Sequence, residues 1–365
     1  MSTTDRTVGL PEIAAPAEAG PAVPPRRLRR PDPKFRLEER DWLRRRLSIL
    51  LAELMSWTVG LLPWPIRFWL ADRAGDIWHR LAPTSRGNVR ANLSQVFGAD
   101  TLEPRLDGLV RGVFRQNARN FTDLFRMPHW DAADFTRLVA VDEGDWALLD
   151  AARARGKGIV LVTAHLGAFD VVGQAIGARG HPMTALTGRT TARFIFDAVT
   201  HLRRGHNVVT IEATPAGVRK VVQALRRNEL AGMVSDYDFF QNGLPVTLFG
   251  RETTMPPGPV RFARDTGASV VGAFARRAEA GYAIAFAGPF EVPKTRDREA
   301  DMATGMAKLA AMIEEAIAAV PEQWVILQRV WPGAPPEPVR VFPVGSPLES
   351  GLLKRVDELL PPRRD

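Results

Sequence analysis

Between about residues 158 and 320, short apolar runs alternate with amphipathic segments, and this alternation constrains the fold more than any other feature of the chain. The runs are rich in β-branched residues and are bounded by glycine or polar residues, as buried strands are. Strands that alternate with helices in this way form α/β domains with a largely parallel sheet. We expect strands at residues 158–163, 181–187, 207–211, 230–235, 269–275 and 283–287.

The segments between these runs have helical spacing. Apolar residues three, four and seven positions apart follow Pro215, and they place the basic residues off the apolar stripe. We expect a helix to begin there, and further helices at residues 169–176, 194–204 and 303–320. The pattern at residues 101–149 is also helical and indicates no deep site.

Composition divides the chain into four expected segments. Residues 1–33 are rich in proline and alanine, lack the apolar run of a signal peptide, and are expected to be a disordered tail. Residues 34–80 are basic and then apolar, and residues 341–365 are expected to be a C-terminal tail. Residues 81–340 are expected to form one catalytic α/β domain, with a mostly parallel central sheet flanked by helices.

The segment 34–80 favours membrane association. Arginines precede an apolar run at residues 47–70, and several tryptophans, which favour the bilayer interface, surround it. Glu53 and two prolines interrupt the run, and its cleanest part, residues 47–62, is shorter than the roughly 20 residues that a spanning helix needs. We expect an interfacial hydrophobic helix at the cytoplasmic face of the plasma (inner) membrane. A core helix behind a solvated charge run is the alternative.

Composition also limits the chemistry. The net charge of +8 favours anionic partners, although its sign does not distinguish nucleic acid, phospholipid head groups and an acidic carrier protein. The absence of cysteine excludes disulfides, a cysteine nucleophile and thiolate metal sites. The chain contains no phosphate-binding G-x-x-x-x-G-K-[ST] motif and no G-x-S-x-G nucleophile motif. We expect no metal and no cofactor.

The sequence from Thr163 to Asp170, TAHLGAFD, carries the chemistry, because it lies where an expected strand ends and a helix begins. Within one helix, His165 and Asp170 would diverge by about 140°, so they can meet only across a turn, which Gly167 permits. We expect His165 to be a general base and Asp170 to orient its imidazole. Backbone N–H groups near Gly167 are candidates for oxyanion stabilisation. A histidine with a purely structural role is the alternative.

At these residues the chain resembles the lysophospholipid and lipid A acyltransferase superfamily, whose signature is a histidine, four residues, and then Asp or Glu. Further blocks resemble its lipid A lauroyl/myristoyl branch, which includes the phosphatidylinositol mannoside acyltransferases. The resemblance spans about residues 85–331. The blocks are Leu186-Thr187-Gly188-Arg189, of which only the arginine is shared, Ser235-Asp236-Tyr237-Asp238, Gly243 to Gly250, Thr254 to Pro259, and Pro321-Glu322-Gln323-Trp324.

The resemblance implies a membrane-associated O-acyltransferase. Its acyl donor would be a thioester of acyl carrier protein or coenzyme A, and its acceptor a hydroxyl of a membrane glycolipid or lipid A-type molecule. The expected partners are this donor, the lipid acceptor and the membrane surface, and not nucleic acid. The resemblance also implies substrate binding by Gly167, by Arg189 and by Asp236 and Asp238. Arg189 would bind the acceptor's phosphate or the donor's phosphopantetheine, and the two aspartates would shape the acceptor pocket. These two aspartates could instead begin a turn, and Trp324 is expected to pack.

Three other functions remain open on the sequence. A lysophospholipid acyltransferase would use another acceptor, and a thioesterase would use the same His/Asp pair to activate water. A membrane-bound binding protein with an inactive acyltransferase fold gains little support, because both His165 and Asp170 are present.

Overall fold

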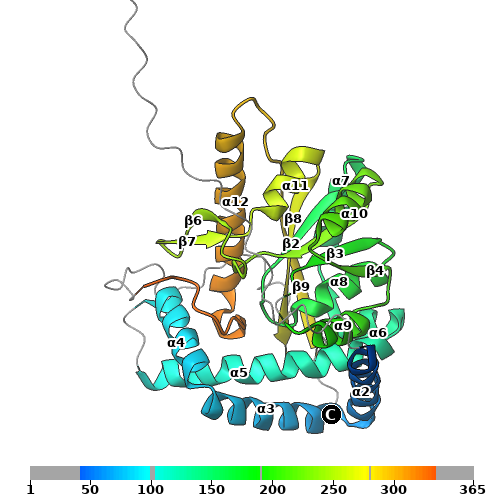
Figure 1. Ribbon diagram of the computed structural model, residues 1–365, viewed down its shortest axis with the longest axis vertical. Helices are drawn as coiled ribbons and strands as arrows, with labels where there is room; N and C mark the ends of the chain where they lie inside the picture. Colours follow the sequence, from blue (N-terminus) through cyan, green and yellow to red (C-terminus); the bar gives the residue numbers. More distant parts are fainter. Residues whose placement is uncertain (1–41, 99–102, 190, 279–280, 334–365) are drawn as a thin grey trace, which may run out of the picture.

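The computed structural model describes residues 42–98, 103–189, 191–278 and 281–333 (Figure 1). The tails expected at residues 1–33 and 341–365 lie outside the described residues. The described chain is built around one seven-stranded sheet and a separate two-stranded hairpin.

The central sheet has the strand order β1-β9-β8-β2-β5-β3-β4. All neighbouring strands in it are parallel except β8 and β9, which are antiparallel. The expected α/β fold with a mostly parallel sheet is therefore confirmed. The strands are β1 (Val139–Val141), β2 (Ile159–Thr163), β3 (Met183–Thr187), β4 (Val208–Glu212), β5 (Leu230–Val234), β8 (Ser269–Ala278) and β9 (Gly281–Phe290).

Helices cover both faces of the sheet, and each face has its own apolar core (Figure 1). One face packs against α6 (Ala132–Leu138), α7 (Glu143–Ala154) and α8 (Phe169–Ala178). The other packs against α10 (Pro215–Arg226), α11 (Gly258–Thr266) and α12 (Arg298–Ala319). Helix α9 (Arg193–Leu202) connects β3 and β4.

Local signals explain where these helices begin. Pro215 occupies the first turn of α10, and the Thr214 hydroxyl accepts a hydrogen bond from the Gly217 N–H at 3.1 Å. Helix α12 begins after Asp297, whose carboxylate accepts a hydrogen bond from the Ala300 N–H at 3.0 Å. The apolar stripe of α12 is buried, as its spacing predicts, and on α10 Val221 and Leu225 are buried whereas Val218 is exposed.

The described chain begins with the helices α2 (Trp42–Leu61), α3 (Trp64–Leu81), α4 (Pro83–Phe97) and α5 (Glu103–Arg126). Helices α3 and α5 run side by side at one end of the molecule, and α2 packs against α9 at the same end (Figure 1). None of the helices in the described part of the chain is both long enough and apolar enough to cross a bilayer.

The structure adds elements that the pattern did not predict. Residues 101–149 contain not only helices but also the short strand β1, which pairs with β9 at the edge of the sheet. The strands β6 (Leu244–Leu248) and β7 (Arg251–Met255) form an antiparallel hairpin beside α12. The short 3-10 helices η2 (Met127–His129) and η3 (Pro321–Gln323) complete the described elements.

Candidate active site

The expected site residues gather at the carboxyl ends of the parallel strands. His165 follows β2, Asp236 follows the adjacent strand β5, and Arg189 follows β3. In open α/β sheets, ligands bind in the crevice outside these strand ends. The sheet order thus brings together residues that lie far apart in the sequence.

Asp236 is the carboxylate that binds His165. The imidazole Nδ1 lies 2.8 Å from Asp236 Oδ1, and the His165 backbone N–H donates to Asp236 Oδ2 at 3.0 Å. A carboxylate at Nδ1 fixes the tautomer with the proton on Nδ1, which leaves Nε2 as the nitrogen that can accept a proton. The pair therefore has the geometry of a general base and its orienting acid.

The surroundings of Asp236 keep it ionised. Its side chain is buried, and the Trp324 indole N–H donates to Oδ2 at 2.8 Å. Burial acts to raise the pKa of Asp236, but attraction to His165 and the hydrogen bonds from His165 and Trp324 outweigh it, so the pKa lies below its usual value. Trp324 packs in the core, as expected, and it also holds the orienting carboxylate.

Hydrogen bonds and a close backbone contact fix the turn at Gly167, which follows His165. Gly167 has a φ of +54°, and a Cβ at this position would lie 2.1 Å from the Ala275 carbonyl oxygen. Its N–H donates to the Gln323 carbonyl at 2.9 Å, and its carbonyl accepts from Asn120 Nδ2 at 2.7 Å. Among the backbone N–H groups near Gly167 that are candidates for oxyanion stabilisation, that of Gly167 itself is therefore already engaged.

Asp170 does not orient His165 in this structure, contrary to the expected pairing. Its carboxylate forms an ion pair with Arg203 at 2.8 Å, whereas the imidazole Nδ1 faces Asp236. The turn at Gly167 does separate the two residues, but Asp170 lies in the first turn of α8 and faces α9. A contribution of Asp170 to catalysis remains a prediction, which would act through Arg203 or through the position of α8.

Two aromatic rings flank the imidazole. The ring centroids of Phe169 and Phe239 lie 5.1 Å and 5.7 Å from that of His165, both edge-on. The His165 side chain is 23% exposed, so a substrate can reach it. The rings limit the approach to the imidazole and place apolar surface beside it.

Arg189 lies in a cluster of charges at the same edge of the sheet. Its Nε donates to Glu212 Oε1 at 3.0 Å, and Arg193 donates to the other oxygen of Glu212 at 3.0 Å. The guanidinium group is oriented by Glu212, and such an oriented fork can bind a phosphate. Phosphate binding by Arg189 remains a prediction.

Asp238 closes a turn. Its carboxylate accepts hydrogen bonds from the N–H groups of Asn242 and Gly243 and from the Thr254 hydroxyl, at 2.7–3.2 Å. These contacts tie the loop after β5 to the hairpin strand β7. The geometry favours a structural role over direct contact with substrate.

The sequence did not predict two contacts of the site, those of Asn120 and Asp236. Asn120, in the C-terminal half of α5, contacts the Gly167 turn, although the segment 101–149 indicated no deep site. Asp236 was expected to bind substrate, and its contact with His165 depends on β2 and β5 being neighbours. Within the described ranges, no group of three His, Asp or Glu side chains lies close enough to hold a metal ion.

Comparisons with known proteins find relatives that cover most of the chain. A profile of the family described as bacterial lipid A biosynthesis acyltransferase matches residues 37–332. The chain is 27% identical over 247 residues to the phosphatidylinositol mannoside acyltransferase of Mycobacterium tuberculosis (strain CDC 1551 / Oshkosh), covering 67% of this chain and 76% of that protein. It is 26% identical over 250 residues to the protein of the same name from Mycolicibacterium smegmatis, covering 67% and 78%.

Proposed function

The chain belongs to the bacterial lipid A biosynthesis acyltransferase family, and we propose that it works at a membrane surface, moving a fatty acyl group from a thioester to a glycolipid hydroxyl. That it is an acyltransferase follows from the family. The donor, the acceptor and the site of action form the proposal. The observation that carries it is the His165–Asp236 pair at the end of the sheet, with Asp236 buried and the His165 side chain partly exposed.

The proposed mechanism uses only this pair and the substrates. Nε2 of His165 takes the proton of the acceptor hydroxyl while the oxygen attacks the thioester carbonyl. The Asp236 carboxylate stabilises the imidazolium ion that forms. When the tetrahedral intermediate collapses, the carbon–sulfur bond breaks, the thiolate takes the proton from the imidazolium, and the ester and a thiol remain. The first turn of α8 has no side-chain cap, and it is the proposed source of N–H donors for the oxyanion.

The proposed acceptor is a glycolipid of the phosphatidylinositol mannoside class. The names of the relatives support this class. Charged contacts support it as well, because they run from Arg189 through Glu212, Arg193 and Asp197 to Arg45 of α2. An acceptor whose phosphate lies at Arg189 would extend along the strand ends, with its sugar hydroxyl near His165.

The proposed membrane contact is the outer side of α2 and α3. Both helices turn their polar groups inward: Ser48 donates to the Phe194 carbonyl, Glu53 pairs with His201, and Asp76 pairs with arginines of α5. Their outer sides carry large apolar residues that the described chain does not cover, namely Trp42, Leu47, Leu50, Leu51, Leu54, Trp57, Leu61, Ile66, Trp69, Leu70, Ile77 and Leu81.

This orientation is the reverse of a helix on a water-soluble surface. An apolar outer side of this extent, with tryptophans and with Arg44 to Arg46 at its start, matches a helix that lies in the bilayer interface. Helix α5 packs against α3 and also contacts the Gly167 turn, so the site and the apolar helices lie at the same end of the molecule (Figure 1). We place the protein at the cytoplasmic face of the inner membrane, because arginine-rich flanks stay in the cytoplasm.

An acceptor-dependence assay tests the proposal. The purified protein would be mixed with radiolabelled palmitoyl-coenzyme A or palmitoyl-carrier protein, with and without phosphatidylinositol mannoside in vesicles. We expect acylated glycolipid and little free fatty acid. Rapid release of fatty acid without any acceptor would indicate a thioesterase, and transfer to lysophospholipid alone would indicate a lysophospholipid acyltransferase.

A further inference from the structure

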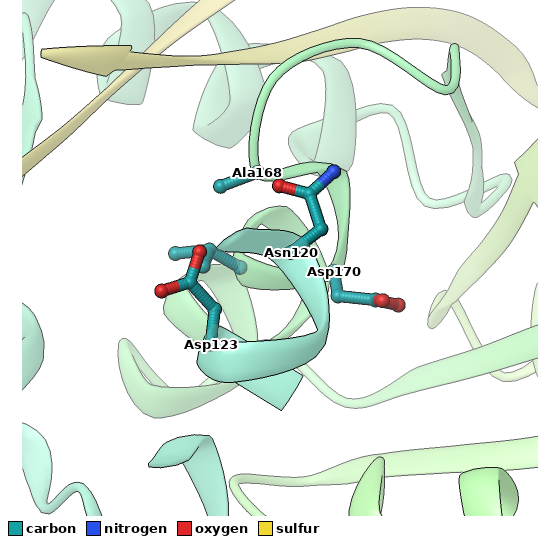
Figure 2. Close-up of a pocket in the computed structure, with 5 residues that line it drawn as sticks. Asn120, Asp123, Ala168 and Asp170 are labelled. Carbon is teal, nitrogen blue, oxygen red and sulfur yellow. The ribbon is translucent and has the colours of Figure 1, made fainter. Parts of the chain in front are cut away.

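A buried polar cluster lies beside the Gly167 turn and contacts it through Asn120. It consists of Asn120 and Asp123 on α5, Arg277 on β8 and Tyr282 on β9, all of which are buried. Figure 2 shows Asn120 and Asp123 next to Ala168 and Asp170 at the start of α8. Asn120 points toward Ala168, whereas the carboxylates of Asp123 and Asp170 point in different directions.

The amide of Asn120 has one orientation in this cluster. Arg277 Nη2 donates to Asn120 Oδ1 at 2.8 Å, so this atom must be the acceptor oxygen. Nδ2 then donates to the Gly167 carbonyl at 2.7 Å. A flipped amide would place its NH2 group against the guanidinium and its oxygen against the carbonyl, so Arg277 fixes the direction of the contact.

Arg277 is also connected to the N–H of Gly167, through Gln323. The Arg277 backbone N–H donates to Gln323 Oε1 at 2.7 Å, and Gln323 Nε2 donates to the Arg277 carbonyl at 3.0 Å. The Gln323 carbonyl in turn accepts the Gly167 N–H. Both sides of the turn are thereby connected to one residue of β8.

Stability alone explains this arrangement poorly. Burial acts to lower the pKa of Arg277, but the Asp123 carboxylate and Tyr282 outweigh it and keep the guanidinium charged. Arg277 Nε and Nη1 are buried and, among the described residues, have no hydrogen-bond partner. Replacing a buried ionic cluster by apolar side chains of similar volume is often neutral or stabilising. The specific result of the cluster here is the contact with the Gly167 carbonyl.

We propose that Asn120, oriented by Arg277, is a positioning residue that fixes the Gly167 turn and thereby sets His165 against Asp236 and the first turn of α8. The proposal rests on the proposed function, in which His165 is the base. Asn120 touches neither the base nor the substrate. Its loss therefore affects the rate of the chemical step and not the binding of either substrate.

The test compares two variants of Asn120 with a matched control. Asn120→Asp keeps the shape and the Arg277 contact but turns the N–H donor into an acceptor, and Asn120→Ala removes both contacts. Gln116→Ala is the control, because Gln116 lies one turn earlier on α5, is equally buried, and its Nε2 has no partner within the described chain. Each variant is assayed for kcat, for KM of both substrates, and for thermal midpoint.

We expect kcat to fall about 10²-fold in both Asn120 variants, the scale of a 1 Å misplacement, with each KM within about twofold of wild type. The downfield NMR resonance of the His165 Nδ1 proton, assigned by its loss in His165→Ala, should shift or broaden in these variants and stay unchanged in Gln116→Ala. The proposal is overturned if kcat in both variants stays within twofold of the control, if KM rises while kcat is unchanged, or if the resonance does not change. If the wild-type protein transfers no acyl group at all, the proposed function fails, and the resonance alone decides the role of Asn120.

Discussion

The carboxylate of Asp236 binds both the imidazole Nδ1 and the backbone N–H of His165, although the two residues follow different strands. One carboxylate thus fixes the tautomer of the base and also the peptide that carries it. The pair is set by the pairing of β2 with β5, so the catalytic geometry depends on the register of the sheet.

His165 and its two candidate partners can be ranked by substitution. We expect His165→Ala to lower kcat about 10²–10⁴-fold, the usual contribution of a positioned general base, without loss of the fold. Asp236→Asn should lower kcat by a comparable factor. The amide can bind the His165 tautomer with its proton on Nε2, and it no longer stabilises the imidazolium ion. Asp170→Asn should lower kcat much less, because Asp170 pairs with Arg203 and not with His165. Steady-state kinetics with circular dichroism would check the order, and a larger loss for Asp170→Asn would restore the pairing expected from the sequence.

Trp324 offers a smaller change at the same carboxylate. Trp324→Phe removes the indole N–H that donates to Asp236 Oδ2 but keeps an aromatic ring in the core. A hydrogen bond to a charged group contributes about 1.5–3 kcal/mol, so we expect kcat to fall at least about tenfold. Trp331→Phe is the control, since its indole N–H donates to the Leu248 carbonyl instead. Equal activities of the two variants would show that Trp324 only packs.

Local patterns in the sequence predict most of the sheet and the base, but not the partners of the base. The strand that becomes β2, the turn at Gly167 and the start of α8 follow from residues close together in the chain. The contact with Asp236 requires the strand order, which no local pattern contains. Asn120 could not be found, because an asparagine on an amphipathic helix has the same signature whether it faces solvent or a buried carbonyl. Asp170 was near His165 in the sequence, but Arg203 competes for it.

Gly167 should tolerate no side chain. Gly167→Ala places a methyl group against the Ala275 carbonyl in a left-handed conformation, and it should abolish activity and lower the thermal midpoint strongly. Gly156→Ala is the matched control, because Gly156 has a φ of +71° with nothing within 4 Å of a Cβ. That control should cost only the conformational strain of about 1–2 kcal/mol. Similar thermal midpoints for the two variants would mean that the turn can relax.

The outer side of α2 can be tested without disturbing its inner contacts. The triple variant Leu50→Gln, Leu51→Gln and Leu54→Gln changes only exposed side chains. We expect at least tenfold weaker flotation with anionic phospholipid vesicles, because apolar burial contributes about 1.5–3 kcal/mol per large side chain. Val218→Gln, an exposed apolar position on α10, should bind like wild type.

Salt provides a second measurement on the same surface. High salt should weaken the binding but not abolish it, since it screens charges and leaves apolar contacts intact. Release of the wild-type protein by salt alone would contradict the proposed apolar contact.

The ion pairs of Asp76 predict a pH dependence of stability. Hydrogen bonds from Arg111 and Arg115 hold the pKa of Asp76 well below its ordinary value of 3.8. A depressed folded-state pKa contributes stability that is present above the ordinary pKa and is lost as the pH falls below it. In urea unfolding, the stability difference between wild type and Asp76→Asn should therefore narrow from pH 6 to pH 3. A difference that stays constant over this range would mean that the pairs do not depend on the charge of Asp76.

The inward-facing polar side of α2 changes what a truncation experiment would measure. If residues 1–70 are deleted, Asp197 and His201 lose the partners that α2 supplies, and the remaining half of α3 keeps only part of its contacts with α5. Such a protein would be a destabilised fragment, and its loss of activity would not report on the membrane. Helices α2 and α3 pack against α9 and α5 and are not a detachable tether, so substitutions on their outer sides are the appropriate way to separate attachment from catalysis.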